Sequence, residues 1–131
     1  MNIINETNYV DEAEKVIKNL SNKIDKRNQK KVPMVTTSKI RNLLAMTADI
    51  YNNVLNSQEE NLSNELVGRI EYLRLRFVYE SGRDTQVKDF VESAGILDII
   101  KEIKGKKSEY ILFNRYMEAL VAFHKYYGGK D

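Results

Sequence analysis

The chain has 131 residues, of which 42% are hydrophobic, and this length suits one domain with a modest core. It carries 21 lysines and arginines against 19 aspartates and glutamates, so its net charge of +2 does not by itself indicate a nucleic-acid-binding protein. The absence of cysteine excludes disulfides, thiolate metal sites and cysteine nucleophiles.

Helical periodicity dominates the sequence. Glycine and proline are scarce, apolar residues recur at intervals of three and four, and no convincing alternating strand is found. We therefore predict an all-α fold, a compact antiparallel bundle of five to six helices. Residues 1–131 are expected to form a single helical domain with flexible ends at 1–7 and 128–131 and a loop over 28–36. No segment has the pattern of a membrane span or a signal peptide, so we expect a soluble, cytoplasmic protein that contacts no membrane.

The first predicted helix covers about residues 8–29, with Ile24 among its core positions. Its last part, "KIDKRNQKK", holds five cations against one carboxylate, which suits a helix C-terminus that runs into a loop. The second helix covers about 38–56. The third covers about 59–81, and Gly82 is the predicted stop.

Two short helices follow, over about 85–94 and 96–104, with a break near Gly95 and an end at Gly105. The last helix, about 108–127, is the richest in aromatic residues. It carries the chain's single histidine, His124, which the helical period places in the middle of the apolar face. We interpret His124 as a structural residue in preference to a catalytic or metal-binding one.

No catalytic signature is found. The sequence contains no Walker loop, GxGxxG, GxSxG or HExxH motif, and no carboxylates form a recognisable acid–base pair. We expect neither an enzyme nor a cofactor. A metal site made of carboxylates from several helices stays open as an alternative.

Three arginines recur at a spacing of seven along the third predicted helix: Arg69, Arg76 and Arg83. If the helix continues that far, they lie nearly on one line, with Tyr72 and Tyr79 on its flank. Arginine beside tyrosine offers phosphate contacts and a stacking surface together. The alternative is that these arginines extend from the edge of the core and pair with Glu71, Glu80 or a neighbouring helix.

The segment "TTSKIR", residues 36–41, begins the second predicted helix. Thr36, Thr37 or Ser38 can serve as its N-cap, which explains the hydroxyl groups. A cap does not explain Lys39 and Arg41, because cations are disfavoured at the positive end of a helix dipole. A bound phosphate would reverse that cost. A cap alone and a cap with a phosphate contact both remain open.

Three stretches, taken in this order, resemble a known family: "TTSKIRNLL" at 36–44, "EYLRLRFVYESGR" at 71–83 and "RYMEALVAFHKYYGG" at 115–129. The family is the small helical subunit of type III-A CRISPR interference complexes, the Csm small subunit. The resemblance covers about residues 35–129, and the third stretch is its most distinctive part.

The resemblance implies a non-catalytic helical protein of antiviral defence that stacks in several copies along a ribonucleoprotein filament. It also implies contacts with guide RNA and target RNA, with the backbone and large subunits of the complex, and with other copies of itself. Its basic motif positions correspond here to Lys39, Arg41, Arg76, Arg83 and Lys125. With Arg69, added from the arginine spacing, these residues are the candidate RNA-binding set. The alternative is a free-standing helical regulator that binds nucleic acid or a partner protein.

Overall fold

The computed structural model describes residues 3–130, which form six helices and no β-strand. The helices are α1 (Tyr9–Ser21), α2 (Thr37–Leu55), α3 (Asn64–Arg83), α4 (Thr85–Ala94), α5 (Ile96–Ile103) and α6 (Lys107–Tyr126). This confirms the predicted all-α bundle. None of the helices in the described range is long and apolar enough to cross a bilayer.

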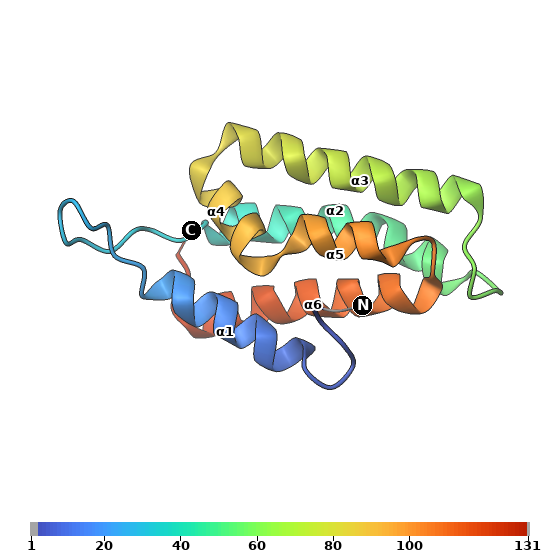
Figure 1. The fold of residues 1–131 in the computed structure, drawn as a ribbon, viewed down its shortest axis with the longest axis horizontal. Helices are drawn as coiled ribbons and strands as arrows, with labels where there is room; N and C mark the ends of the chain where they lie inside the picture. The colour runs from blue at the N-terminus through green and yellow to red at the C-terminus, as the bar shows by residue number, and fades with distance from the viewer. Residues whose placement is uncertain (1–2, 131) are drawn as a thin grey trace.

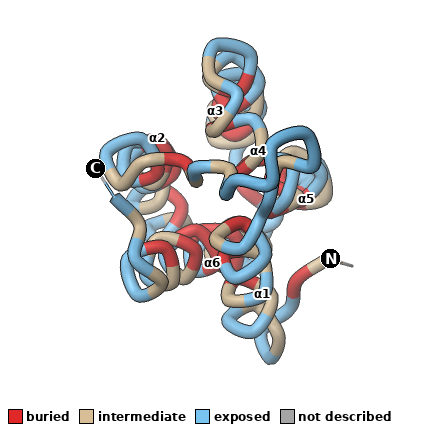
Figure 2. Tube along the Cα trace, turned by 90° about the vertical axis from the view of Figure 1, so that its left-hand side faces the viewer, coloured by how far each residue is buried: buried red, intermediate tan, exposed pale blue. Residues whose placement is uncertain are grey.

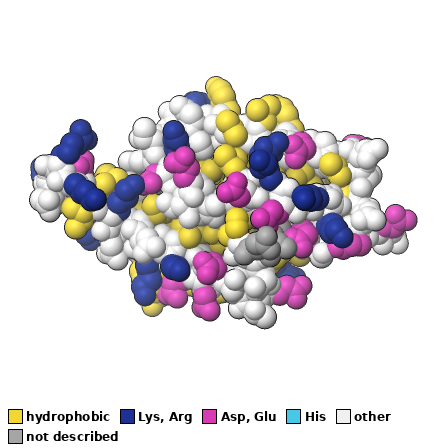
Figure 3. Space-filling model, viewed as in Figure 1, with side chains coloured by type: hydrophobic (Ala, Val, Ile, Leu, Met, Phe, Trp, Pro, Cys, Tyr) yellow, Lys and Arg dark blue, Asp and Glu magenta, His cyan; other side chains and the backbone are white. Residues whose placement is uncertain are grey.

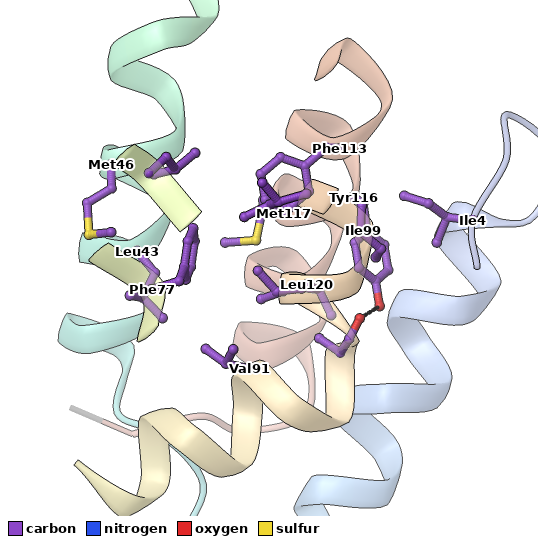
Figure 4. Close-up of a cluster of buried hydrophobic side chains, with 14 of the residues drawn as sticks. Ile4, Leu43, Met46, Phe77, Val91, Ile99, Phe113, Tyr116, Met117 and Leu120 are labelled. Carbon is purple, nitrogen blue, oxygen red and sulfur yellow. Dashed lines mark hydrogen bonds between the residues drawn. The ribbon is translucent and has the colours of Figure 1, made fainter. Parts of the chain in front are cut away.

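The six helices surround one cluster of buried apolar side chains. In Figure 1, α3 runs along one side of the molecule, α1 and α6 run along the opposite side, and α2, α4 and α5 lie between them. Figure 2 shows α6 near the middle of the bundle and α3 at its margin. The core includes Phe77 from α3 and Phe113 from α6, whose rings meet edge to face at 6.4 Å between centroids (Figure 4).

Two buried tyrosines tie α6 to its neighbours. The Tyr116 hydroxyl donates to the Ala94 carbonyl at the end of α4 at 2.8 Å, and the Tyr110 hydroxyl donates to the Thr47 carbonyl in α2 at 2.5 Å (Figure 4 includes Tyr116). Burial raises the pKa of both phenols. Each ring therefore fills the core while its polar end remains hydrogen-bonded.

Local sequence signals explain several helix ends. The Thr36 hydroxyl accepts from the Lys39 amide at 3.3 Å and caps α2, as one of the three hydroxyl residues was expected to do. The Asp84 carboxylate caps α4 by accepting from the amides of Gln86 and Val87. Gly95, at a φ of +68°, separates α4 from α5 in the left-handed conformation that glycine adopts without strain.

The predicted extent of the first helix is wrong. Helix α1 ends at Ser21, eight residues before the expected end, and the following segment folds back on itself. The Asp25 amide donates to the Lys30 carbonyl at 2.8 Å, and the Val32 amide donates to the Lys23 carbonyl at 2.9 Å. Ile24 is consequently 52% exposed and lies outside the core.

The predicted limits of the third helix are also wrong. Its N-cap is Ser63, so residues 59–63 precede the helix, and α3 passes through Gly82 and ends at Arg83. Gly82 does not stop the helix because the boundary lies at Asp84, two residues later, whose carboxylate caps the start of α4. Because α3 continues through Gly82 to Arg83, the arginines spaced by seven, Arg69, Arg76 and Arg83, all lie on one helix, as their predicted alignment required.

Candidate nucleic-acid interface

A groove of about 690 Å³ lies between the first turns of α2 and the end of α3. We call it the α2–α3 groove. Its lining residues are Ser38, Lys39, Arg41, Asn42, Leu43, Glu80, Arg83, Asp84 and Val87. Three of the six candidate residues, Lys39, Arg41 and Arg83, therefore meet at one site although up to 44 positions separate them in the chain.

Lys39 has a partner that the sequence alone did not reveal. Its ammonium group forms an ion pair with Asp84, the residue that caps α4. This hydrogen bond to Lys39 is the main reason that the pKa of the Asp84 carboxyl lies below its usual value, and the amides of Val87 and Gln86 add to the effect. The cation that was unfavourable at the start of α2 is thus compensated by a carboxylate from the α3–α4 junction.

Arg41 and Arg83 differ in how much of their charge is already paired. Arg83 lies 3.4 Å from the Glu80 carboxylate and 5.5 Å from the centre of the Tyr79 ring, yet its side chain remains 61% exposed. Arg41 is exposed, and its guanidinium has no hydrogen bond or ion pair within residues 3–130. The groove accordingly carries three cations against the two carboxylates of Glu80 and Asp84, and Arg41 supplies the excess positive charge.

The two remaining arginines of the seven-residue spacing line a neighbouring hollow of about 320 Å³ beside α2. Arg69 is half-buried there and donates to the Asn53 side chain at 3.2 Å and to the Asp49 carbonyl at 3.4 Å. The pairing with a neighbouring helix that was considered from the sequence therefore applies to Arg69. Arg76 is exposed and makes no such contact among the described residues.

Arg76 lies within an apolar surface on the outer side of α3. Tyr72 and Tyr79 are each 63% exposed, and Leu75 between them is 59% exposed. Figure 3 shows hydrophobic side chains at the surface above α3. The flanking tyrosines predicted from the helical period are thus accessible on both sides of Arg76.

Lys125 is exposed on α6 and does not line the α2–α3 groove. The structure therefore separates it from the three cations that meet there. No group of His, Asp and Glu side chains within residues 3–130 is arranged to hold a metal ion.

Comparison with known proteins identifies the family. The family model described as Csm2 Type III-A matches residues 7–130. The chain belongs to this Csm2 family. It is 44% identical to a protein from Streptococcus thermophilus named CRISPR system Cms protein Csm2, over 131 residues that span the whole of both chains.

Two further Csm2 relatives carry the same name. One from Enterococcus italicus is 34% identical over 120 residues, covering 88% of this chain and 86% of its own. One from Mycobacterium tuberculosis is 40% identical over 97 residues, covering 74% of this chain and 78% of its own. The family resemblance predicted from three short stretches is thus confirmed. The family model also matches residues before the first of these stretches, including α1.

Two features of this Csm2 family member escaped prediction from the sequence. Asp84 was not considered as a partner for Lys39, although an aspartate directly before "TQV" is an ordinary N-cap signal. The fold-back after Ser21 was predicted as helix, although Asp25 and Asn28 mark a turn. Their side chains accept from the amides of Arg27 and Lys30 at 2.9 and 3.0 Å, which is typical of Asx turns.

Proposed function

We propose that the protein is a non-catalytic small subunit of a type III-A CRISPR ribonucleoprotein complex. In this role it stacks with other copies of itself along the filament, against the backbone and large subunits. Its basic residues contact the sugar–phosphate backbone of the guide RNA and target RNA, and it acts in the cytoplasm. Membership of the Csm2 family supports the place in the complex.

The observation that carries the proposed RNA contact is the position of Arg41. An arginine that is exposed, unpaired and directed to a groove with Lys39 and Arg83 retains its full capacity to bind a phosphate. Arg83 can exchange its weak contact with Glu80 for a phosphate, because an exposed ion pair contributes only about 0–1 kcal/mol. The groove therefore presents two arginines to one ligand.

The chemistry of the groove suits recognition of a backbone without base reading. In a guided complex, base pairing carries the sequence information, so the protein needs only contacts to phosphate and sugar. Arg76 between Tyr72 and Tyr79 extends the accessible surface along α3. Arg69 supports α2 in this scheme and contributes less to RNA binding, because both its observed contacts are to α2.

A free-standing DNA-binding regulator is less consistent with the fold. Its recognition helix would need a polar, exposed face, and α6 instead lies near the middle of the bundle (Figure 2). The buried positions of α6 are Tyr110, Leu112, Phe113, Asn114, Tyr116, Met117, Leu120 and His124. These side chains are committed to the core, so α6 is poorly suited to enter a groove of DNA.

The test is replacement of the three exposed arginines in the assembled complex. The triple variant Arg41→Gln, Arg76→Gln, Arg83→Gln should still assemble but retain target RNA less well than the wild type, measured by salt-dependent RNA retention. The matched control, Lys15→Gln, Lys101→Gln, Lys104→Gln, removes the same charge from exposed residues elsewhere. Equal retention by both variants would show that the assigned face is wrong. Recovery of the tagged protein from its host without guide RNA and backbone subunits would refute the place in the complex.

A further inference from the structure

The segment after α1 concentrates the positive charge of the molecule. Residues 23–31 hold five of the 21 cations and one of the 19 carboxylates, so the rest of the chain has 16 cations against 18 carboxylates. We call this segment the basic hairpin. Its cations are Lys23, Lys26, Arg27, Lys30 and Lys31. A nearly neutral protein thus consists of a slightly acidic body and a strongly basic projection.

The backbone of the basic hairpin is defined by its own hydrogen bonds. Ile24 and Lys31 form an antiparallel bridge, and the Gln29 amide donates to the Asp25 carbonyl at 2.8 Å. The hairpin extends from one end of the bundle in Figure 1, and Figure 3 shows Lys and Arg side chains gathered at that end. The cations are therefore presented away from the body by a turn that does not depend on them.

Most of this charge is unpaired. Within residues 3–130, the side chains of Lys26, Lys30 and Lys31 have neither a hydrogen bond nor an ion pair. Arg27 lies 3.5 Å from Asp25 but its side chain is 91% exposed, and only Lys23 is bound to the body, through Asp89 at 2.8 Å. Four cations are consequently available to an external anion.

A second groove, of about 480 Å³, continues from the base of the hairpin. Lys31 and Lys130 line it together with the C-terminal turn, and none of its lining residues within 3–130 is a carboxylate. Thr36 lines this groove and Ser38 lines the α2–α3 groove, so only the first turn of α2 separates the two. Cations therefore follow one another from Arg83 and Arg41 across the start of α2 to Lys130, Lys31 and the hairpin.

We propose that the basic hairpin binds the phosphodiester backbone of a nucleic-acid strand that continues from the α2–α3 groove across the start of α2. The identity of that strand as RNA rests on the proposed function. Residues 23–31 contain no aromatic side chain and one large apolar residue, Ile24. The hairpin thus has no aromatic ring on which a base could stack, and Ile24 alone is a small apolar surface for a protein interface. Unpaired cations on an extended segment are suited to phosphates, which carry one charge per nucleotide.

The experiment measures binding of the full chain to a fluorescent uridine homopolymer and to a thymidine homopolymer of equal length, between about 50 and about 200 mM salt. The hairpin variant is Lys26→Gln, Arg27→Gln, Lys30→Gln, Lys31→Gln. The matched control is Lys15→Gln, Lys101→Gln, Lys104→Gln, Lys106→Gln, and the groove variant is Arg41→Gln, Arg83→Gln. All should unfold cooperatively on heating, because the turn is held by backbone contacts.

The hairpin variant should bind both strands at least about tenfold more weakly at low salt, with a salt slope smaller by about 0.7 for each phosphate that the hairpin no longer neutralises. The control should keep the wild-type slope. If only the hairpin variant binds more weakly, the hairpin binds the strand and the α2–α3 groove does not. If only the groove variant binds more weakly, the groove binds the strand and the hairpin does not. Weaker binding by both supports both sites. The inference would be overturned if the control weakened binding equally, or if the hairpin variant weakened binding of only one of the two strands. It would also be overturned if the wild type bound no strand, or if it bound polyglutamate, an anion without phosphates, more tightly than RNA.

Discussion

His124 is held by one residue far away in the chain and by one close to it. Its Nε2–H donates to the Val35 carbonyl at 2.6 Å, and its own carbonyl accepts from the Gly129 amide at 2.8 Å. The side chain is 1% exposed. The predicted structural role thus has a definite form, because the imidazole joins the start of α2 to the end of α6.

This arrangement predicts that Gly129→Ala is destabilising. A Cβ at position 129 would overlap the His124 ring, so the substitution should lower the free energy of unfolding by about 1–3 kcal/mol, as overpacking does. Gly68→Ala is the matched control, since a Cβ there meets no atom within 4 Å and replaces glycine inside a helix. It should raise stability by up to about 1 kcal/mol. Urea denaturation of both variants measures the difference, and equal effects would refute the steric argument.

The ion pair between Lys39 and Asp84 predicts a small dependence of stability on pH. The folded-state pKa of Asp84 is lowered, so its contribution is present above its ordinary pKa of 3.8 and is lost as pH falls through the folded-state value. Asp84→Asn keeps a capping oxygen but removes the charge. The variant should be less stable than wild type by under about 1 kcal/mol at neutral pH, because the pair is partly exposed. The difference between the two denaturation curves should shrink as pH falls below 3.8, and a difference that stays unchanged there would exclude the ion pair as its cause.

At the scale of elements, the sequence predicted the helix limits well where the local end signals agree with the apolar pattern of the helix. The limits of α2, α4, α5 and α6 fall within one residue of the expected ones, because caps or glycines coincide with the ends of their apolar patterns. Helix α1 was extended too far because Ile24 continues the three–four spacing. The turn at Asp25 and Asn28 overrides that spacing, since their side chains satisfy backbone amides outside a helix.

A substitution of Ile24 distinguishes the predicted longer helix from the observed basic hairpin. In a continued helix its side chain would be part of the core, whereas in the basic hairpin it is 52% exposed. Ile24→Ala should therefore change the free energy of unfolding by less than about 0.5 kcal/mol. Ile17→Ala, at a fully buried position of α1, should cost about 2–5 kcal/mol. A comparable destabilisation at both positions would favour the longer helix.

For the whole molecule, the sequence predicted part of the candidate site. The spacing of Arg69, Arg76 and Arg83 was sufficient to place them on one side of α3. It could not reveal that Asp84 neutralises Lys39, 45 positions away, because that pair exists only once α3 and α4 return the chain to the start of α2. It also could not show that four of the five cations of residues 23–31 project from the body while Lys23 pairs with Asp89. Both facts depend on tertiary structure and both determine where positive charge is available.

This distribution of charge predicts that copy number strongly affects RNA affinity. A single chain brings only the cations of the basic hairpin and the α2–α3 groove to a strand, so its binding should be weak, but two linked copies convert the second contact into an intramolecular one. A tandem fusion with a flexible linker should bind a long uridine homopolymer about 100-fold more tightly than one copy. The control is the same fusion with Arg41→Gln, Arg83→Gln and the four hairpin substitutions in one copy, which should return to the affinity of a single chain. Equal affinities for the fusion and the single chain would show that the exposed cations of neighbouring copies do not act on one strand together.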